Sequence, residues 1–204
     1  FPLLIWIGAD GEANDQYDWL GMHLASSGYI TVVLPPEWNA GETQSQCISI
    51  IMLWYRLEYN HNNGSFEGDP QNMRDAFDLL NWGIGGHGVG AKQAAQCQLI
   101  MSGDWKEYVS IPLPNALVAL GLENVNTDVP IQSLGPSPEP GMGLYLTGTL
   151  DNMAKADNNV EVWLDDNNIP WHYMSVIGAN HLQYKDEHSF FEGWNDGSAT
   201  MDRT

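Results

Sequence analysis

A glycine-rich stretch near the middle of the chain, Gly85-Gly86-His87-Gly88-Val89-Gly90-Ala91, has the spacing of a catalytic turn. In a nucleophile elbow, written G-x-S-x-G, a serine sits at the centre of a tight turn between a strand and a helix. The flanking positions are small because the two backbones pass close together. Here the central position is Gly88, which has no hydroxyl group. The stretch therefore predicts the turn and the place of a nucleophile, without the nucleophile itself.

Two residues with complementary chemistry follow strand-like segments further along the chain. Asp151 comes just after residues 143–149, and His181 follows residues 171–177. One class of hydrolytic triads has the chain order nucleophile, acid, histidine. In such a triad the carboxylate orients the histidine, which acts as a general base. Asp151 alone is typical of a turn and His181 of a loop, but their order after the elbow favours the catalytic roles.

Residues from distant parts of the chain can meet at one edge of a parallel sheet, and the sequence predicts such a sheet. Residues 1–8 and 29–34 are nearly continuous apolar runs, typical of strands buried on both faces, and a helical pattern lies between them. A strand, a helix and a strand in close succession form a βαβ unit with parallel strands. We expect further strands and helices in the segments 115–121, 143–149 and 171–177 (strands) and 91–101 and 154–167 (helices).

The fold class predicted from this alternation is α/β, with a mostly parallel central sheet and helices on both faces. We expect one domain over residues 1–204, with no internal repeat. The chain starts in what reads as a strand already under way, so we expect a segment to be missing at this end. Open sheets of this class bind their ligands at the carboxyl ends of the strands.

Residues 37–68 are harder to interpret. The apolar segment 48–57 fits either a helix or a strand, and residues 60–68 read as a polar loop. Asp69-Pro70 is a helix start signal, which predicts a helix through Trp82. Only Trp82-Gly83-Ile84 is then left as the strand before the elbow. Either that strand is unusually short, or residues are missing from the sequence at this point.

Four segments, in order over nearly the whole chain, are similar to motifs of one enzyme group. They are Leu24-Ala25-Ser26-Ser27-Gly28-Tyr29, Gly86-His87-Gly88-Val89-Gly90, Leu146-Thr147-Gly148-Thr149-Leu150-Asp151 and Gly178-Ala179-Asn180-His181. The chain thus resembles α/β-hydrolases of the dienelactone hydrolase, chlorophyllase and polyester hydrolase (cutinase-like) group. The resemblance implies the α/β-hydrolase fold and a serine carboxyl-ester hydrolase scaffold for small-molecule or polymeric esters, with no cofactor. It also implies an oxyanion hole made by the backbone N–H groups of Val89 and Ala9.

The glycine at position 88 leaves three interpretations of this scaffold open. The first is a serine hydrolase whose serine is replaced in this chain, which makes the molecule inactive as written. The second is a natural pseudoenzyme with a structural or binding role in an extracellular assembly or homo-oligomer. The third, a hydrolase with another nucleophile, is disfavoured because no Ser, Cys or Asp occupies the elbow.

The charge balance restricts the partners. Seven Lys and Arg face 26 Asp and Glu, a formal net charge of -19. This balance excludes nucleic acid and anionic membrane surfaces, because binding to either depends on cationic side chains. No apolar run approaches the ~20 residues of a membrane-spanning helix. The acidic composition favours an exported or extracellular protein, and residues 186–202 are a minor candidate for binding Ca²⁺.

The cysteines and the other histidines have no metal-ligand spacing. Cys47 and Cys97 are far apart in the sequence, and we expect two buried thiols, with a disulfide as the alternative. His87 is expected to be structural, packed beside the elbow rather than acting as a base. The remaining histidines, to which we assign no role, are His23, His61, His172 and His188.

Overall fold

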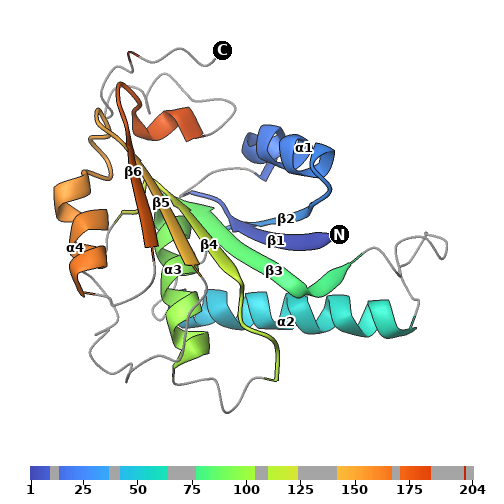
Figure 1. The fold of residues 1–204 in the computed structure, drawn as a ribbon. Coiled ribbons are helices and arrows are strands. Elements are labelled where there is room, and N and C mark those ends of the chain that lie inside the picture. Colours follow the sequence, from blue (N-terminus) through green and yellow to red (C-terminus); the bar gives the residue numbers. More distant parts are fainter. Residues whose placement is uncertain are drawn as a thin grey trace.

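Six parallel strands form one sheet in the computed structural model of the chain (Figure 1). The strands are β1 (Pro2–Ile7), β2 (Ile30–Leu34), β3 (Asp78–His87), β4 (Ala116–Leu120), β5 (Met142–Gly148) and β6 (Trp171–Val176). The structure describes residues 1–9, 14–36, 42–63, 77–103, 110–123, 142–166, 171–184 and 200. The predicted α/β class and the parallel sheet are confirmed.

The strand order in the sheet is β2-β1-β3-β4-β5-β6. The chain adds β2 on one side of β1 and then crosses back, so that β3 and all later strands are added on the other side. The order therefore reverses between β1 and β3. In open α/β sheets, ligands bind outside the carboxyl ends of the strands at such a reversal.

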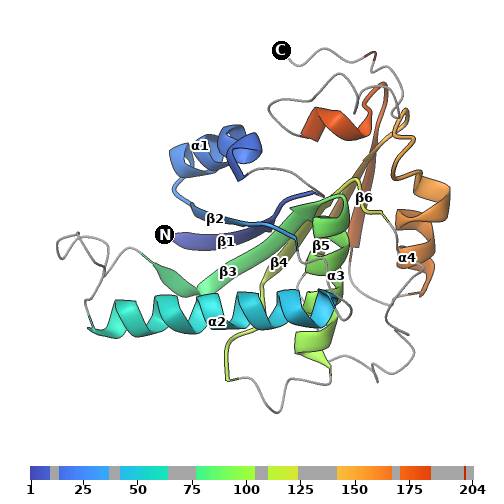
Figure 2. The same cartoon turned by 180° about the vertical axis from the view of Figure 1, so that it is seen from behind.

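Helices lie on both faces of the sheet, as Figures 1 and 2 show from opposite sides. Helices α2 (Glu42–Asn63) and α3 (Val89–Ser102) pack against each other on one face, whereas α1 (Asp18–Ser26) lies on the other. Helix α4 (Val160–Asp166) precedes β6. Three short 3-10 helices complete the described elements: η1 (Asn14–Tyr17), η3 (Ala156–Asn158) and η4 (His181–Tyr184).

Alternating side chains of β1 divide the core into two parts. Leu3, Ile5 and Ile7 are buried in the larger cluster, which includes apolar side chains of α2, α3 and α4. Trp6, on the opposite face, packs with Tyr17 in the smaller cluster. This division follows from the two-residue side-chain period of a strand. The smaller cluster also includes Leu120, the last residue of β4, so it lies near the carboxyl ends of the central strands.

The segment that fitted either a helix or a strand is helix α2. Its buried side chains recur at intervals of three or four residues, which is the spacing of one helix face. The apolar side chains on this face are Cys47, Ile50, Ile51, Trp54 and Leu57. The helix continues to Asn63, so the prediction of a loop from residue 60 is wrong for residues 60–63. Helix α4 is shorter than the predicted 154–167, because the chain forms the 3-10 turn of η3 first.

The prediction of a helix through Trp82 is wrong for residues 78–82, which belong to the ten-residue strand β3. Of the two alternatives for the strand before the elbow, an unusually short strand is therefore wrong as well. Pro2 pairs with Asp78 but Leu3 pairs with Trp82, so residues 79–81 bulge out of register. The Asp78 carboxylate accepts hydrogen bonds from the backbone N–H groups of Leu80 (3.3 Å) and Asn81 (3.2 Å), which stabilise the bulge. The start of the predicted helix, residues 69–76, lies outside the described residues.

Gly90 is expected to tolerate no side chain. A Cβ atom there would lie 2.2 Å from the carbonyl oxygen of Gly8 and 2.4 Å from that of Ile7. We expect Gly90→Ala to lower the free energy of unfolding by about 1–3 kcal/mol, the usual cost of overpacking, in urea denaturation. The matched control is Gly21→Ala in α1, where a Cβ meets nothing within 4 Å. This control should raise stability by up to ~1 kcal/mol through helix propensity, and equal effects of the two variants would contradict the close approach.

Candidate active site

The turn between β3 and α3 has the shape of the predicted elbow. Gly88 connects the last residue of β3, His87, to the first residue of α3, Val89, with φ 58° and ψ −123°. A side chain in this conformation is strained. Before the turn, a Cβ at Gly86 would lie 2.4 Å from the carbonyl carbon and oxygen of Gly90. The glycines around position 88 are therefore required by the close approach of strand and helix.

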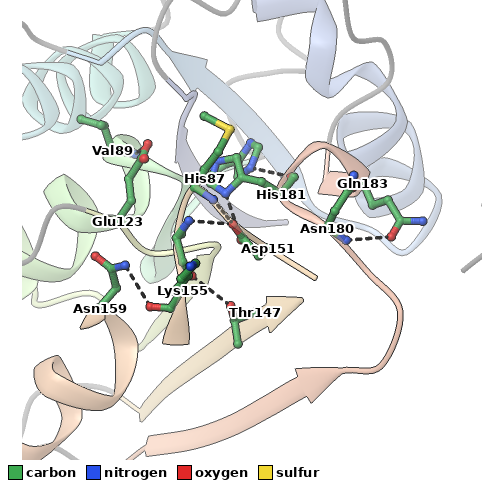
Figure 3. A network of polar contacts seen from close by, with 12 residues as sticks. His87, Val89, Glu123, Thr147, Asp151, Lys155, Asn159, Asn180, His181 and Gln183 are labelled. Carbon is green, nitrogen blue, oxygen red and sulfur yellow. Dashed lines mark hydrogen bonds and ion pairs between the residues drawn. The ribbon is translucent and has the colours of Figure 1, made fainter. Parts of the chain in front are cut away.

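Asp151 and His181, which are 30 residues apart, are hydrogen-bonded to each other (Figure 3). His181 Nδ1 lies 3.0 Å from Asp151 Oδ2, and both side chains are buried. An ionised carboxylate only accepts hydrogen bonds, so Nδ1 carries the proton and Nε2 of the neutral ring has the lone pair. The other oxygen, Asp151 Oδ1, accepts the backbone N–H groups of Met153 (3.1 Å) and Ala154 (2.7 Å). These bonds hold the carboxylate in position for the histidine.

Position 88 faces His181. A Cβ atom built on Gly88 would lie 3.1 Å from His181 Nε2 and 3.4 Å from the Cβ of Ala9. The structure thus brings together Gly88, Asp151 and His181, the three residues expected to form the triad. They follow the carboxyl ends of β3, β5 and β6. Ala9, which follows β1, borders the same space. This is the edge of the sheet where the strand order reverses.

Gly121, directly after β4, makes room for the histidine and was not identified from the sequence. A Cβ at this position would lie 2.8 Å from His181 Nδ1 and 3.2 Å from Asp151 Oδ2. Its φ of +53° is a second reason for glycine. The only signal in the sequence is a glycine at the end of a predicted strand, and such glycines are common in turns.

Glu123 is a second site residue that sequence reasoning missed. Its Oε1 accepts the backbone N–H of Val89 at 3.0 Å, and it lies 2.7 Å from the Cβ position of residue 88. The side chain is buried, with a relative exposure of 9%. Glu123 follows β4 and belongs to no motif, so only the fold reveals that its carboxylate reaches the elbow. Figure 3 shows it directed toward Val89.

A second series of hydrogen bonds starts at the backbone of Ala9. The backbone N–H of Ala9 donates to the Tyr17 hydroxyl (2.8 Å), which lies 3.0 Å from His87 Nδ1. His87 Nε2 lies 3.2 Å from the carbonyl oxygen of His181. A carbonyl oxygen only accepts, so Nε2 carries the proton and Nδ1 accepts the tyrosine proton. His87 is buried and hydrogen-bonded beside the elbow, and its expected structural role stays a prediction.

Both backbone groups expected to form the oxyanion hole have acceptors within the protein. Val89 donates to Glu123, and Ala9 donates to Tyr17. A substrate oxygen can bind to them only if these acceptors move or share the donors. Of these two acceptors, Glu123 has the carboxyl group, and it adjoins position 88.

The two cysteines lie in the core away from this site. Both are buried and have free thiols, so the expected disulfide-free state is the one observed. Burial raises the pKa of Cys47 well above its usual value because it disfavours the thiolate, and the neighbouring Cys97 raises it further. The Cys47 thiol is therefore a poor nucleophile near neutral pH.

Within the described ranges, no group of three or more His, Cys, Asp and Glu side chains is arranged to hold a metal ion. His23 and His172 are exposed. The calcium candidate at 186–202, apart from residue 200, and the side chains of His61 and His188 lie outside what the structure describes. None of the helices described is both long enough and apolar enough to cross a membrane.

Comparison with known proteins adds no family assignment, since the sequence matches no protein-family model and no curated protein. Function is therefore inferred from the geometry of the site.

Replacing Gly121 tests how the Asp151–His181 pair is held. We expect Gly121→Ala to displace the imidazole and to lower the free energy of unfolding by about 1–3 kcal/mol, the cost of side-chain strain at positive φ. In proton NMR spectra, the downfield resonance of the hydrogen-bonded His181 Nδ1–H should disappear, as it should in His181→Gln. A variant that keeps this resonance unchanged would show that Gly121 does not position the pair.

Proposed function

We propose that the chain has the α/β-hydrolase fold and carries a serine carboxyl-ester hydrolase site without its nucleophile. The observation that carries this proposal is the relation of position 88 to His181. A Cβ at position 88 lies 3.1 Å from Nε2 of a histidine whose Nδ1 is bonded to a buried aspartate. A serine hydroxyl at this position would be within reach of a general base.

The surroundings of position 88 support the same proposal. The elbow follows β3, on one side of the strand-order reversal, and the loop after β1 is on the other side. The backbone conformation of Gly88 directs a side chain out of the strand–helix turn toward the histidine. Ester hydrolysis of this kind needs no cofactor, and the proposed substrates are small-molecule or polymeric esters.

In this proposal each residue has a defined role. His181 takes the proton of the nucleophile and returns it to the leaving alcohol, while Asp151 keeps the ring in the required tautomer. The N–H of Val89 would stabilise the oxyanion once Glu123 has moved aside, joined by that of Ala9 once Tyr17 releases or shares it. Without a hydroxyl at position 88, the chain forms no acyl-enzyme on the elbow and is inert as a serine esterase.

The alternative is a natural pseudoenzyme with a binding or structural role in an extracellular assembly. One observation favours it specifically. Glu123 Oε1 lies 2.7 Å from the Cβ position of residue 88, so its carboxylate occupies space that a serine would need. The site is thus adapted to glycine at this position. For this alternative we expect a stable oligomer in analytical ultracentrifugation, and a strictly monomeric particle would count against it.

Restoring the serine tests the proposed scaffold. We expect Gly88→Ser to hydrolyse p-nitrophenyl acetate, whereas the native chain does not. Adding Glu123→Ala should raise the rate by roughly 10²-fold, the contribution of one oxyanion-hole donor, because Val89 is then available to the substrate. The serine should also lower the free energy of unfolding by about 1–3 kcal/mol, since it holds a strained conformation.

The matched control is Gly88→Ala, which introduces the same strain without a hydroxyl. It should lose stability to a similar extent and remain inactive. A second control, His181→Gln in the Gly88→Ser background, should abolish the gained activity. If Gly88→Ser and its double variant with Glu123→Ala both fold and remain inert, the proposed hydrolase site is refuted.

A further inference from the structure

We propose that β6 is a dimer interface, at which it pairs in antiparallel orientation with β6 of a second copy of this chain. The six-stranded sheets of the two copies would then form one continuous sheet across a twofold axis. The inference uses no residue of the candidate active site. It is therefore independent of the chemistry proposed for position 88.

Strand β6 lies at one edge of the sheet and, among the described strands, pairs only with β5 (Figure 1). Such an edge presents backbone N–H and C=O groups to which another strand can bond. Four of its six residues are exposed, namely Trp171, His172, Met174 and Ser175, and so is the following residue, Ile177. The strand is therefore accessible along its length.

The side chains of β6 do not protect this edge from pairing. Natural edge strands avoid pairing with another chain through charged residues, especially lysine, or through proline. Residues 171–177 contain none of these, and residues 167–184 as a whole include no Asp, Glu, Lys or Arg. Instead, the side chains of Trp171, Met174 and Ile177 are apolar and are 44, 54 and 84% exposed. These are the properties of a strand to which a further strand adds.

The charge and the spacing of these side chains favour a second copy as the occupant. Copies with a formal net charge of -19 repel each other, so association is favoured at a surface without acidic side chains. A basic partner would instead bind where carboxylates gather, and this strand has none. The exposed apolar residues are also evenly spaced, three residues apart, on either side of Met174.

This spacing makes the strand complementary to itself. A twofold axis through the sheet at Met174 makes the two strands antiparallel. Trp171 of one copy then lies opposite Ile177 of the other, and Met174 lies opposite Met174 of the second copy. Cross-strand pairs of aromatic and β-branched side chains stabilise a sheet.

The opposite edge of the sheet differs from β6. All five side chains of β2 are half-buried, and α1 packs against the strand. Pro35 and Pro36 follow β2 after its last residue, Leu34, and proline donates no backbone hydrogen bond. Of the two edge strands that the structure describes, only β6 is thus exposed and unprotected. Pairing through β6 therefore closes the assembly as a dimer.

The small size of the interface sets its expected strength. Residues 171–177 supply seven residues per copy, against about 20–30 per side in a standard interface, so we expect a dissociation constant in the micromolar range. Because the two copies carry the same net charge, added salt should tighten the dimer by screening their repulsion. An interface held together by ion pairs would weaken with salt instead.

Analytical ultracentrifugation of the native chain between about 1 and 200 µM, the range expected for so small an interface, tests the proposal. We expect a reversible dimer. Met174→Lys places two like charges opposite each other at the axis and should raise the dissociation constant by roughly tenfold or more. Because Met174 is exposed, circular dichroism should show that this variant keeps the native fold. Met22→Lys, the same change at a 69% exposed position on α1, should leave the dimer unchanged.

A disulfide across the axis locates the interface. Residues directly opposite each other in antiparallel strands have Cα atoms about 4.5–5.5 Å apart, within the range that a disulfide spans. Met174→Cys should therefore form a covalent dimer in oxidised glutathione, whereas Met22→Cys should not. A native chain that stays monomeric over the whole concentration range would overturn the proposal. So would a dissociation constant that Met174→Lys leaves unchanged, equal cross-linking of the two cysteine variants, or a dimer that salt dissociates.

Discussion

The close approach of α3 to the ends of β1 and β3 is the constraint on which the site depends. Gly86 and Gly90 allow the backbones to come within a distance that no Cβ permits. The turn between them then has the positive φ of Gly88, which directs position 88 toward His181. Because β5 and β6 lie parallel in the same sheet, their carboxyl ends bring Asp151 and His181 to this turn. The sheet and the glycines together therefore determine the geometry of the site.

Much of the sheet could be predicted from the sequence, because buried parallel strands leave a strong local signal. The apolar runs that become β1 and β2 and the segments that become β4, β5 and β6 were recognised in this way. Only residues 82–84 of β3 were predicted as strand, since its first residues follow a helix start signal and bulge out of register at residues 79–81. Tertiary pairing with β1 overrides the local pattern there. Helix α2 was ambiguous for a different reason, because an apolar run alone does not distinguish a helix from a strand.

The candidate site could be predicted only where a residue belongs to a motif. Gly88, Asp151 and His181 have recognisable surroundings and a recognisable order, and the structure brings them together. Gly121 and Glu123 belong to no motif. Their roles in the site come from contacts across the sheet edge, which only the fold shows. Glu123 changes the interpretation of the site most. Its carboxylate lies beside position 88, in space that a serine side chain would need. The glycine at position 88 therefore fits its surroundings and is more than the loss of one serine.

The relation between position 88 and His181 is tested most directly by the acidity of a thiol placed there. In Gly88→Cys, a thiol within reach of the His181–Asp151 pair should have a pKa well below the ordinary value of ~8.5, because the imidazolium stabilises the thiolate. Its rate of alkylation by iodoacetamide should then stay high below neutral pH, and His181→Gln should remove the effect. The native thiols of Cys47 and Cys97 add little background, since both are buried. An alkylation profile with an ordinary thiol pKa, unchanged by His181→Gln, would contradict the proposed site.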